Sequence, residues 1–488
     1  MNTNLANAPT DVQTPLCVDL DGTLIRTDLL WESLIILLAR NPFYVFLLPV
    51  WLIKGKAWLK RQLSSRVVLD TRSLPYCSEL LEYLRDQRQG GRRLVLITAS
   101  DRALAEAVAE HVGLFHEVIG SDGARNLKGP RKREFLIERF GEKGFDYAGN
   151  SWADVPVWRG CSRSIVVNAS ERVGKQAASV STVERTFPRA GPGGIKTLRR
   201  AIRDHQCVKN FLIFLPLVTS HQVAHFAPLL NALLGFIAFS FCASSVYVLN
   251  DLVDLRNDRL HPTKRKRPLA SGDLSIPQGL ALLVVLMAAA VLTALRLPVP
   301  FLIVLGIYYS LTLAYSLSLK RRLLVDIFVL GGLYTIRVLA GSAATGIETS
   351  PWLLAFCLFF FLSLALVKRY TELRVLKDEH RSAISARGYI PADLPLLGSL
   401  GTSSGFLCVL VLALYVNSPQ VIPLYRSPAV LWFLCPLILY WISRIWLMAY
   451  RGTMNDDPVL FAVRDRVSYL TVACGGAILA MATHNWRL

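Results

Sequence analysis

The sequence has few charged residues and no cysteine pattern. Only 18% of its 488 residues are charged, whereas 53% are hydrophobic, which is too apolar for a soluble enzyme of this length. Its nine cysteines show no paired spacing, so neither a disulfide framework nor a zinc site is indicated. The first 14 residues lack the basic and then apolar order of a signal peptide, and we therefore expect the first domain to stay in the cytosol.

The formal net charge of +19 is large for a chain with so few charges. In a membrane protein, excess Lys and Arg gather in cytoplasmic loops, where they contact anionic head groups or phosphorylated substrates. Nucleic acid is the other common partner of a basic chain, but no basic stripe interleaved with aromatic residues occurs outside the loops between apolar segments. We therefore expect a membrane and phosphorylated substrates as partners, and no nucleic acid.

Residues 1–185 predict an α/β domain, because strand-like runs alternate with helix-like runs as in a parallel sheet. Sheets of this kind place their sites at the carboxyl ends of the strands. Polar residues follow the strand-like runs at Asp19, Asp21, Thr98, Lys132, Asn150 and Asp154.

This order of residues resembles the haloacid dehalogenase (HAD) superfamily, whose members have a Rossmann-like sheet. The resemblance implies that Asp19 is the nucleophile that forms an aspartyl-phosphate and that Asp21 is the general acid and base. Thr98 and Lys132 would hold the phosphoryl oxygens. Mg²⁺ would bind Asp19, the carbonyl of Asp21 and the later acidic loop.

That acidic loop departs from the family pattern. Asn150 stands where the family usually has an aspartate, and Asp154 is the one carboxylate that remains there. Both are expected metal ligands, because an amide oxygen also suits Mg²⁺, but the site loses a charge. An active phosphatase and a degenerate, structural domain both stay open.

The cap of this domain is expected at about 29–90. Its apolar runs are about 10–12 residues long, too short to span a bilayer. They predict a helical hairpin in the membrane interface, with an ordinary buried helix pair as the alternative. The residues expected at head-group level are Trp31, Trp51, Lys54, Lys56 and Lys60.

Residues 208–488 predict an all-α domain that crosses the membrane, preceded by a linker and a basic helix over 186–207. About nine spans are expected near 208–224, 228–249, 277–296, 299–317, 323–345, 351–367, 393–416, 428–448 and 468–485. Basic residues gather in alternate loops, which places those loops and the first domain in the cytosol. An odd number of spans then leaves the C-terminus on the opposite side of the inner membrane.

The second predicted span ends in four residues with oxygen-bearing side chains, Asn250, Asp251, Asp254 and Asp258. At helical spacing the three carboxylates project from one face. Carboxylates at a membrane edge are costly unless they have a function, and Mg²⁺ is a usual ligand. Lys264 and Arg267 follow directly in a basic cluster and are candidate substrate contacts.

These spans and this motif resemble the UbiA prenyltransferase superfamily. The resemblance implies that Asp251 and Asp254, with their neighbours, bind a diphosphate through Mg²⁺. Aromatic-prenylating members have a second aspartate motif after the sixth span. This chain instead has Lys368, Arg369, Tyr370 and Arg374 there, which resembles the decaprenyl-phosphate phosphoribosyltransferase branch. That branch joins a polyprenyl phosphate to phosphoribosyl diphosphate (PRPP) and releases pyrophosphate.

The leading hypothesis is therefore a two-enzyme membrane protein. The basic residues would hold the lipid phosphate or the ribose 5-phosphate, with Tyr315, Lys320 and Arg337 as further contacts; Arg337 could equally be a salt-bridge partner within its span. The alternative is a UbiA enzyme that prenylates an aromatic or other small acceptor, with an inactive or regulatory HAD domain. Asp378 and Glu379 would then be the second aspartate pair. The sequence leaves a homo-oligomer open.

Overall fold

The computed structural model describes residues 14–121, 127–189, 191, 193–378, 388–419, 425–454 and 457–483. The chain folds into two compact units. The first contains Met1–Ile202 and Tyr247–Leu282, and the second contains Arg203–Val246 and Leu283–Leu488. The first unit therefore combines the α/β domain with the segment that carries the aspartate motif.

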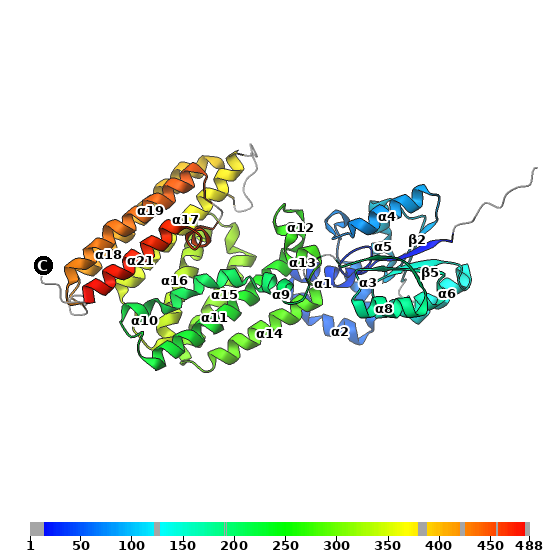
Figure 1. The fold of residues 1–488 in the computed structure, drawn as a ribbon, viewed down its shortest axis with the longest axis horizontal. Coiled ribbons are helices and arrows are strands. Elements are labelled where there is room, and N and C mark those ends of the chain that lie inside the picture. The colour runs from blue at the N-terminus through cyan, green and yellow to red at the C-terminus, as the bar shows by residue number, and fades with distance from the viewer. Residues whose placement is uncertain are drawn as a thin grey trace, which may run out of the picture. The chain divides into compact units, whose positions relative to one another are not determined.

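The α/β domain contains one sheet of six parallel strands in the order β3-β2-β1-β4-β5-β6 (Figure 1). The strands are β1 Leu16–Asp19, β2 Leu94–Asp101, β3 Glu117–Ser121, β4 Asp146–Gly149, β5 Arg163–Val167 and β6 Thr182–Phe187. The connections run in opposite directions on the two sides of β1, which makes the carboxyl end of this strand the usual place for a site.

Helices cover both faces of the sheet, as α4 and α8 show (Figure 1). Successive side chains of β1 point to opposite faces. Val18 packs in the cluster with α4 Ser78–Gln89 and α5 Arg102–Val112. Cys17 packs in the cluster with α6 Pro130–Phe140, α7 Val155–Gly160 and α8 Glu171–Val180. The predicted α/β architecture is confirmed.

The cap consists of short helices: α1 Leu29–Arg40, η1 Pro42–Phe46, α2 Leu48–Ile53, α3 Lys56–Ser64 and η2 Thr71–Ser73. They fold around a small apolar cluster that includes Trp51. Trp51 is only 8% exposed, so its expected place at head-group level is wrong. Lys60 instead donates to the carbonyl of Ala99 at 2.6 Å. The side chain of Lys56 lies outside the described part.

Eight helices of the described residues are long and apolar enough to cross a membrane. They are α11 Phe226–Val253, α14 Ile276–Ala294, α15 Val299–Leu317, α16 Val325–Thr345, α17 Pro351–Asp378, α18 Leu394–Val416, α19 Leu434–Arg451 and α21 Arg466–Thr483. Short helices join them: α9 Gly194–Ile202, α12 Leu255–Leu260, η5 Lys264–Lys266, α13 Pro268–Ser271, η6 Leu319–Arg321, η7 Pro391–Asp393, η9 Pro428–Phe433 and α20 Pro458–Ala462. The chain is an integral membrane protein.

The span predicted over 208–224 does not form one long helix, so the expected count of nine is wrong for the described residues. This region consists of η4 Asp204–Phe214 and α10 Leu215–Thr219, which pack against α16. It contains the buried polar side chain of Asn210, and Pro216 supplies no backbone N–H. The odd count that placed the C-terminus on the opposite side therefore has no support here.

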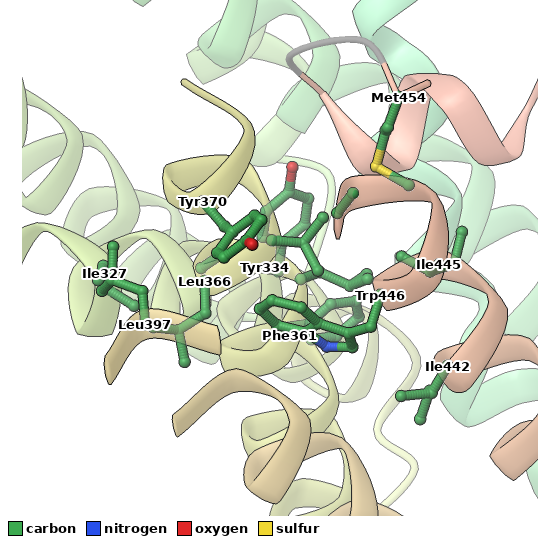
Figure 2. Close-up of a cluster of buried hydrophobic side chains, with 14 of the residues drawn as sticks. Ile327, Tyr334, Phe361, Leu366, Tyr370, Leu397, Ile442, Ile445, Trp446 and Met454 are labelled. Atoms are coloured by element: carbon green, nitrogen blue, oxygen red, sulfur yellow. The ribbon is translucent and has the colours of Figure 1, made fainter. Parts of the chain in front are cut away.

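The second unit has an aromatic core where α16, α17, α18 and α19 meet (Figure 2). The Trp446 ring lies edge-on to Tyr370, with 5.8 Å between ring centroids, and its indole N–H donates to Ser363 Oγ at 3.0 Å. A Cβ atom on Gly401 would lie 1.9 Å from the Trp446 ring. Gly401 is therefore required for the close contact between α18 and α19.

Gly401→Ala is expected to lower the unfolding temperature of the detergent-solubilised protein by several degrees, because overpacking a core costs about 1–3 kcal/mol. Gly476→Ala on α21 is the matched control, since a Cβ there meets no atom within 4 Å. Thermal unfolding monitored by circular dichroism measures both. Equal tolerance of the two substitutions would contradict the close packing of α18 on α19.

Two candidate active sites

The first candidate site lies at the carboxyl end of β1. Asp19 ends this strand, and Lys132 in the first turn of α6 donates to its Oδ1 at 2.6 Å. Both side chains are buried. Thr23 donates to the other oxygen of Asp19 at 3.3 Å. The sheet thus holds a carboxylate beside an ammonium group, as a nucleophile that attacks a phosphate ester requires.

The second carboxylate of the loop, Asp21, is held by donors from two other segments. The hydroxyls of Thr98 and Ser100 donate to its Oδ2 at 3.1 and 2.6 Å, and the backbone N–H of Leu29 donates to Oδ1 at 2.8 Å. The structure therefore brings Asp21 and Thr98 together at the edge where Asp19 lies. Ser100 was not predicted, although it stands only two residues after Thr98.

Asn150 lies directly against the nucleophile loop. Gly22 has a φ of +81°, and a Cβ there would lie 2.0 Å from Nδ2 of Asn150. Asp154 instead accepts hydrogen bonds from the backbone N–H groups of Asn150 and Ser151, the Ser151 hydroxyl and the Tyr147 hydroxyl, at 2.8–3.1 Å. Its carboxylate thus orders its own loop.

The oxygens of this site suit a hard cation such as Mg²⁺. The donors are the carboxylate of Asp19, the carbonyl of Asp21 and the carboxamide of Asn150. No group of three or more His, Cys, Asp or Glu within the described residues is arranged to hold a metal ion, and Asp154 is engaged by its loop. The predicted ligand set stays a prediction, with fewer charged oxygens than an all-aspartate site would have.

Tyr147 is a site residue that the sequence did not reveal. Lys132 donates to its hydroxyl at 2.9 Å, and the hydroxyl donates to Asp154. Burial raises the pKa of Tyr147 well above its ordinary value, with Asp154 and Asp19 acting in the same direction. Burial acts to lower the pKa of Lys132, but the neighbouring aspartates raise it. The lysine therefore stays charged and the phenol stays neutral.

The second candidate site is formed around the aspartate motif of the first unit. α11 ends at Val253, but backbone hydrogen bonds from Asp254 to Asn250 and from Asp258 to Asp254, both 2.9 Å, continue the helical register. Arg267 Nη1 donates to Asp251 at 3.0 Å and to Asp258 at 2.6 Å. These two buried carboxylates therefore share a face, as predicted.

The other predicted residues of this segment are less enclosed. Asn250 and Asp254 are half-buried, and Lys264 is exposed on η5. Arg267, expected as a substrate contact, instead pairs with the motif itself. A guanidinium between two carboxylates marks a place that favours a cation, which is the property a Mg²⁺ site needs.

Most of the predicted basic contacts of the second unit are engaged in packing. Arg369 pairs with Asp326 and Glu372 and donates to the Tyr315 hydroxyl at 3.0 Å. Burial acts to lower the pKa of Arg369, but these partners raise it. Their positions therefore support a buried network, because buried charge is stable only when it is paired.

Tyr370, Arg374 and Lys320 also differ in their surroundings from a simple anion site. The Tyr370 ring lies in the aromatic core (Figure 2). Arg374 lies over the ring of Tyr450, 5.9 Å from its centroid. Lys320 is half-buried on η6. The pair Asp378 and Glu379 cannot serve as a comparison, since Glu379 and the Asp378 side chain lie outside the described residues.

Arg337 is buried inside α16 among aromatic rings. Its guanidinium donates to Asn210 at 3.0 Å and to the Tyr308 hydroxyl at 3.3 Å, and lies over the rings of Phe239 and Tyr334. No carboxylate of the described residues pairs with it, so the alternative of a salt-bridge partner is not supported in this part of the chain. It remains a cation available to an anion.

Lys209 and Asp457 form a contact that the sequence did not suggest. Asp457 caps α20 and pairs with Lys209 of η4, and Lys368 of α17 lies 3.9 Å from the same carboxylate. Burial acts to raise the pKa of Asp457, but the two lysines outweigh it and lower the pKa to about 2. This loop is therefore anchored rather than merely solvated.

Family models match both halves of the chain. The model of the UbiA prenyltransferase family covers residues 212–474, and that of the haloacid dehalogenase-like hydrolases covers residues 16–159. The first covers more than half of the chain. The chain therefore belongs to the UbiA prenyltransferase family and carries an N-terminal HAD-like domain. Members of both families typically use Mg²⁺.

Three similar proteins illustrate this membership. An uncharacterized protein of Sinorhizobium fredii, y4nM, is 37% identical over 97% of this chain and 91% of its own. The decaprenyl-phosphate phosphoribosyltransferase of Mycobacterium tuberculosis is 32% identical over 58% of this chain and 93% of its own. A UbiA homolog from Archaeoglobus fulgidus, solved with GPP and Mg²⁺, matches 58% of this chain and 99% of its own at 16% identity and a TM-score of 0.45.

The Asp457 contact predicts a stability that depends on pH. A carboxyl whose pKa falls from 3.8 to about 2 stabilises the folded protein by about 2 kcal/mol above pH 4, and this contribution is lost as the pH falls toward 2. Asp457→Asn should therefore lower the unfolding temperature at pH 7, and the difference from wild type should shrink below pH 4. Thermal unfolding between pH 3 and pH 8 measures this.

Glu171→Gln is the control for this experiment, because Glu171 lies in an exposed ion pair on α8, which contributes little. A constant difference between wild type and Asp457→Asn across the pH range would contradict the assigned contact.

Proposed function

We propose that the UbiA-type domain transfers a 5-phosphoribosyl group from PRPP to a polyprenyl phosphate and releases pyrophosphate. The observation that carries the proposal is the pair of buried carboxylates, Asp251 and Asp258, gathered around one cation. The basic residues at 368, 369 and 374 support it, since two anionic substrates need cations where an aromatic acceptor does not. The name of the mycobacterial relative agrees.

The reaction joins two anions. An ionised oxygen of the lipid phosphate forms a bond to C1 of the ribose, and the bond from C1 to the diphosphate oxygen breaks, so that the electron pair leaves with pyrophosphate. The attacking oxygen is ionised near neutral pH, so no general base is required. Mg²⁺ would supply neutralisation of the diphosphate at Asp251, Asp254 and Asp258. Arg337 and Lys368 would hold the remaining phosphate charge.

Asp251→Asn combined with Asp254→Asn is expected to lower the formation of lipid-linked ribose at least about 100-fold, because the carboxylates that would hold the cation are lost. Labelled PRPP and polyprenyl phosphate, incubated with the protein in nanodiscs, provide the measurement. Glu348→Gln, an exposed loop position, is the control. Unchanged turnover in the double variant, or no lipid-linked ribose from wild type, would overturn the transferase assignment.

We further propose that the HAD-like domain removes the 5-phosphate from this product. Asp19 would attack the phosphorus atom and displace the ribose 5-oxygen, and Asp21 would protonate that oxygen. Water then releases phosphate from the aspartyl-phosphate. The ammonium of Lys132, 2.6 Å from Asp19, would stabilise the phosphoryl charge. The product would be a lipid-linked pentose, a donor for glycan assembly.

Asp19→Asn should leave the lipid-linked product with its 5-phosphate, because an amide cannot form the phosphoenzyme. Mass spectrometry of the extracted lipid distinguishes the two products. Asp86→Asn, at an exposed position of α4, is the control. If the variant and wild type give the same ratio of phosphorylated to dephosphorylated lipid, the HAD-like domain has another substrate or a structural role.

The cap supports a lipid-linked substrate for this domain. On η1 and α2, Phe43 and Phe46 are each 73% exposed and Ile53 is 86% exposed, and Lys54 lies over the ring of Trp58 at 5.5 Å. Exposed apolar side chains beside an aromatic residue and a lysine are typical of a segment in the membrane interface. We propose that this face of the cap contacts the bilayer, with the HAD-like domain and the basic loops in the cytosol.

A variant with Phe43→Ser, Phe46→Ser and Ile53→Ser tests the cap. It is expected to retain hydrolysis of a small soluble phosphate ester and to lose at least about tenfold in hydrolysis of the lipid-linked ester, since contact with the bilayer brings the site to its substrate. Val68→Ser, at a fully exposed apolar position of the same domain, is the control. Equal loss on both substrates would indicate misfolding rather than membrane contact.

A further inference from the structure

The first unit contains a cavity of about 710 Å³ that neither candidate site includes. Its volume lies within the range of about 300–1,000 Å³ that is usual for small-molecule sites. Asp273 is the one acidic residue among the described residues that line it. Six basic residues line it: Arg26, Arg72, Arg200, Arg259, Arg265 and Lys266. This excess of positive charge predicts an anionic ligand.

Arg26 supplies an independent sign that the cavity lacks a ligand partner. Its Nε atom is buried and has no hydrogen-bond partner, which is rare in native proteins. The residue itself is well fixed, because its backbone N–H donates to Pro75 at 2.8 Å. Gly272, with a φ of +80°, lets the loop after α13 approach, since a Cβ there would lie 2.6 Å from Cβ of Arg26.

The basic residues differ in how far their charge is already compensated. Arg259 pairs with Glu32 at 2.5 Å, and Arg200 lies 4.0 Å from Asp273. Arg72, Arg265 and Lys266 have no carboxylate within ion-pair distance among the described residues. Uncompensated charge therefore comes from two segments, η2 of the cap and η5 after the aspartate motif. A single phosphate group is too small to reach both.

We propose that this cavity binds the diphosphate group of a soluble phosphorylated ligand. Arginine side chains from separate segments would each contact a different phosphate through paired N–H donors. No metal ion is needed, because the protein itself supplies the positive charge. An occupant would also hold η5 in place, and Arg267, the next residue, is the one that pairs with Asp251 and Asp258. The inference does not depend on the proposed function.

The test uses full-length protein in nanodiscs of neutral lipid, with EDTA present, and inorganic pyrophosphate as the probe in calorimetric titration. Without Mg²⁺ the aspartate motif and Asp19 repel the probe, so binding reports on the cavity. Saturable binding is expected, tighter than that of orthophosphate and weaker at higher salt. Arg72→Gln combined with Arg265→Gln should weaken it at least tenfold. Arg172→Gln, at an exposed position of α8, should not.

Two further arms separate this inference from its neighbours. Binding should persist in the variants of Asp19 and of Asp251 with Asp254, whether or not those variants have lost turnover. No binding without Mg²⁺, or equal binding by the Arg72 and Arg265 variant, would overturn the proposal. Loss of pyrophosphate binding in nanodiscs of anionic lipid would identify a lipid head group as the occupant and would overturn the assignment to a soluble ligand.

Discussion

The structure depends on the pairing of charges that are kept away from water. Burying an ionised group is costly unless an opposite charge and hydrogen bonds compensate it. Lys132 compensates Asp19, Arg267 compensates Asp251 and Asp258, and Asp326 compensates Arg369. In each case the pair fixes the position of a side chain in a candidate site. The same charges that would act on a phosphate therefore also hold the local fold together.

The sequence predicted those parts of the fold that depend on local patterns. Apolar runs ending in Asp19 and Thr98 indicated parallel strands, and both residues lie at the expected edge of the sheet. The helical spacing of Asp251 and Asp258 indicated a shared face, and one arginine joins them. These features could be recognised because each depends on residues that are close in the chain or on the regular geometry of a strand or a helix.

Other features could not be predicted because they depend on contacts between distant residues. Lys209 and Asp457 are separated by 248 positions, and nothing near either one indicates its partner. Tyr147 looked like an ordinary strand residue, and Trp51 was expected at the membrane interface but fills the cap. The span over 208–224 was predicted from its apolar residues, whereas Asn210 and Pro216 favour a short, interrupted helix.

The surroundings of Arg337 have a consequence for the way the protein responds to its medium. This guanidinium is enclosed by aromatic rings and neutral hydrogen-bond acceptors, out of reach of dissolved ions. Counterions screen exposed charges over about 8 Å at physiological ionic strength, but they screen enclosed charges far less. An anion held at Arg337 would therefore be retained in concentrated electrolyte that displaces anions from surface arginines.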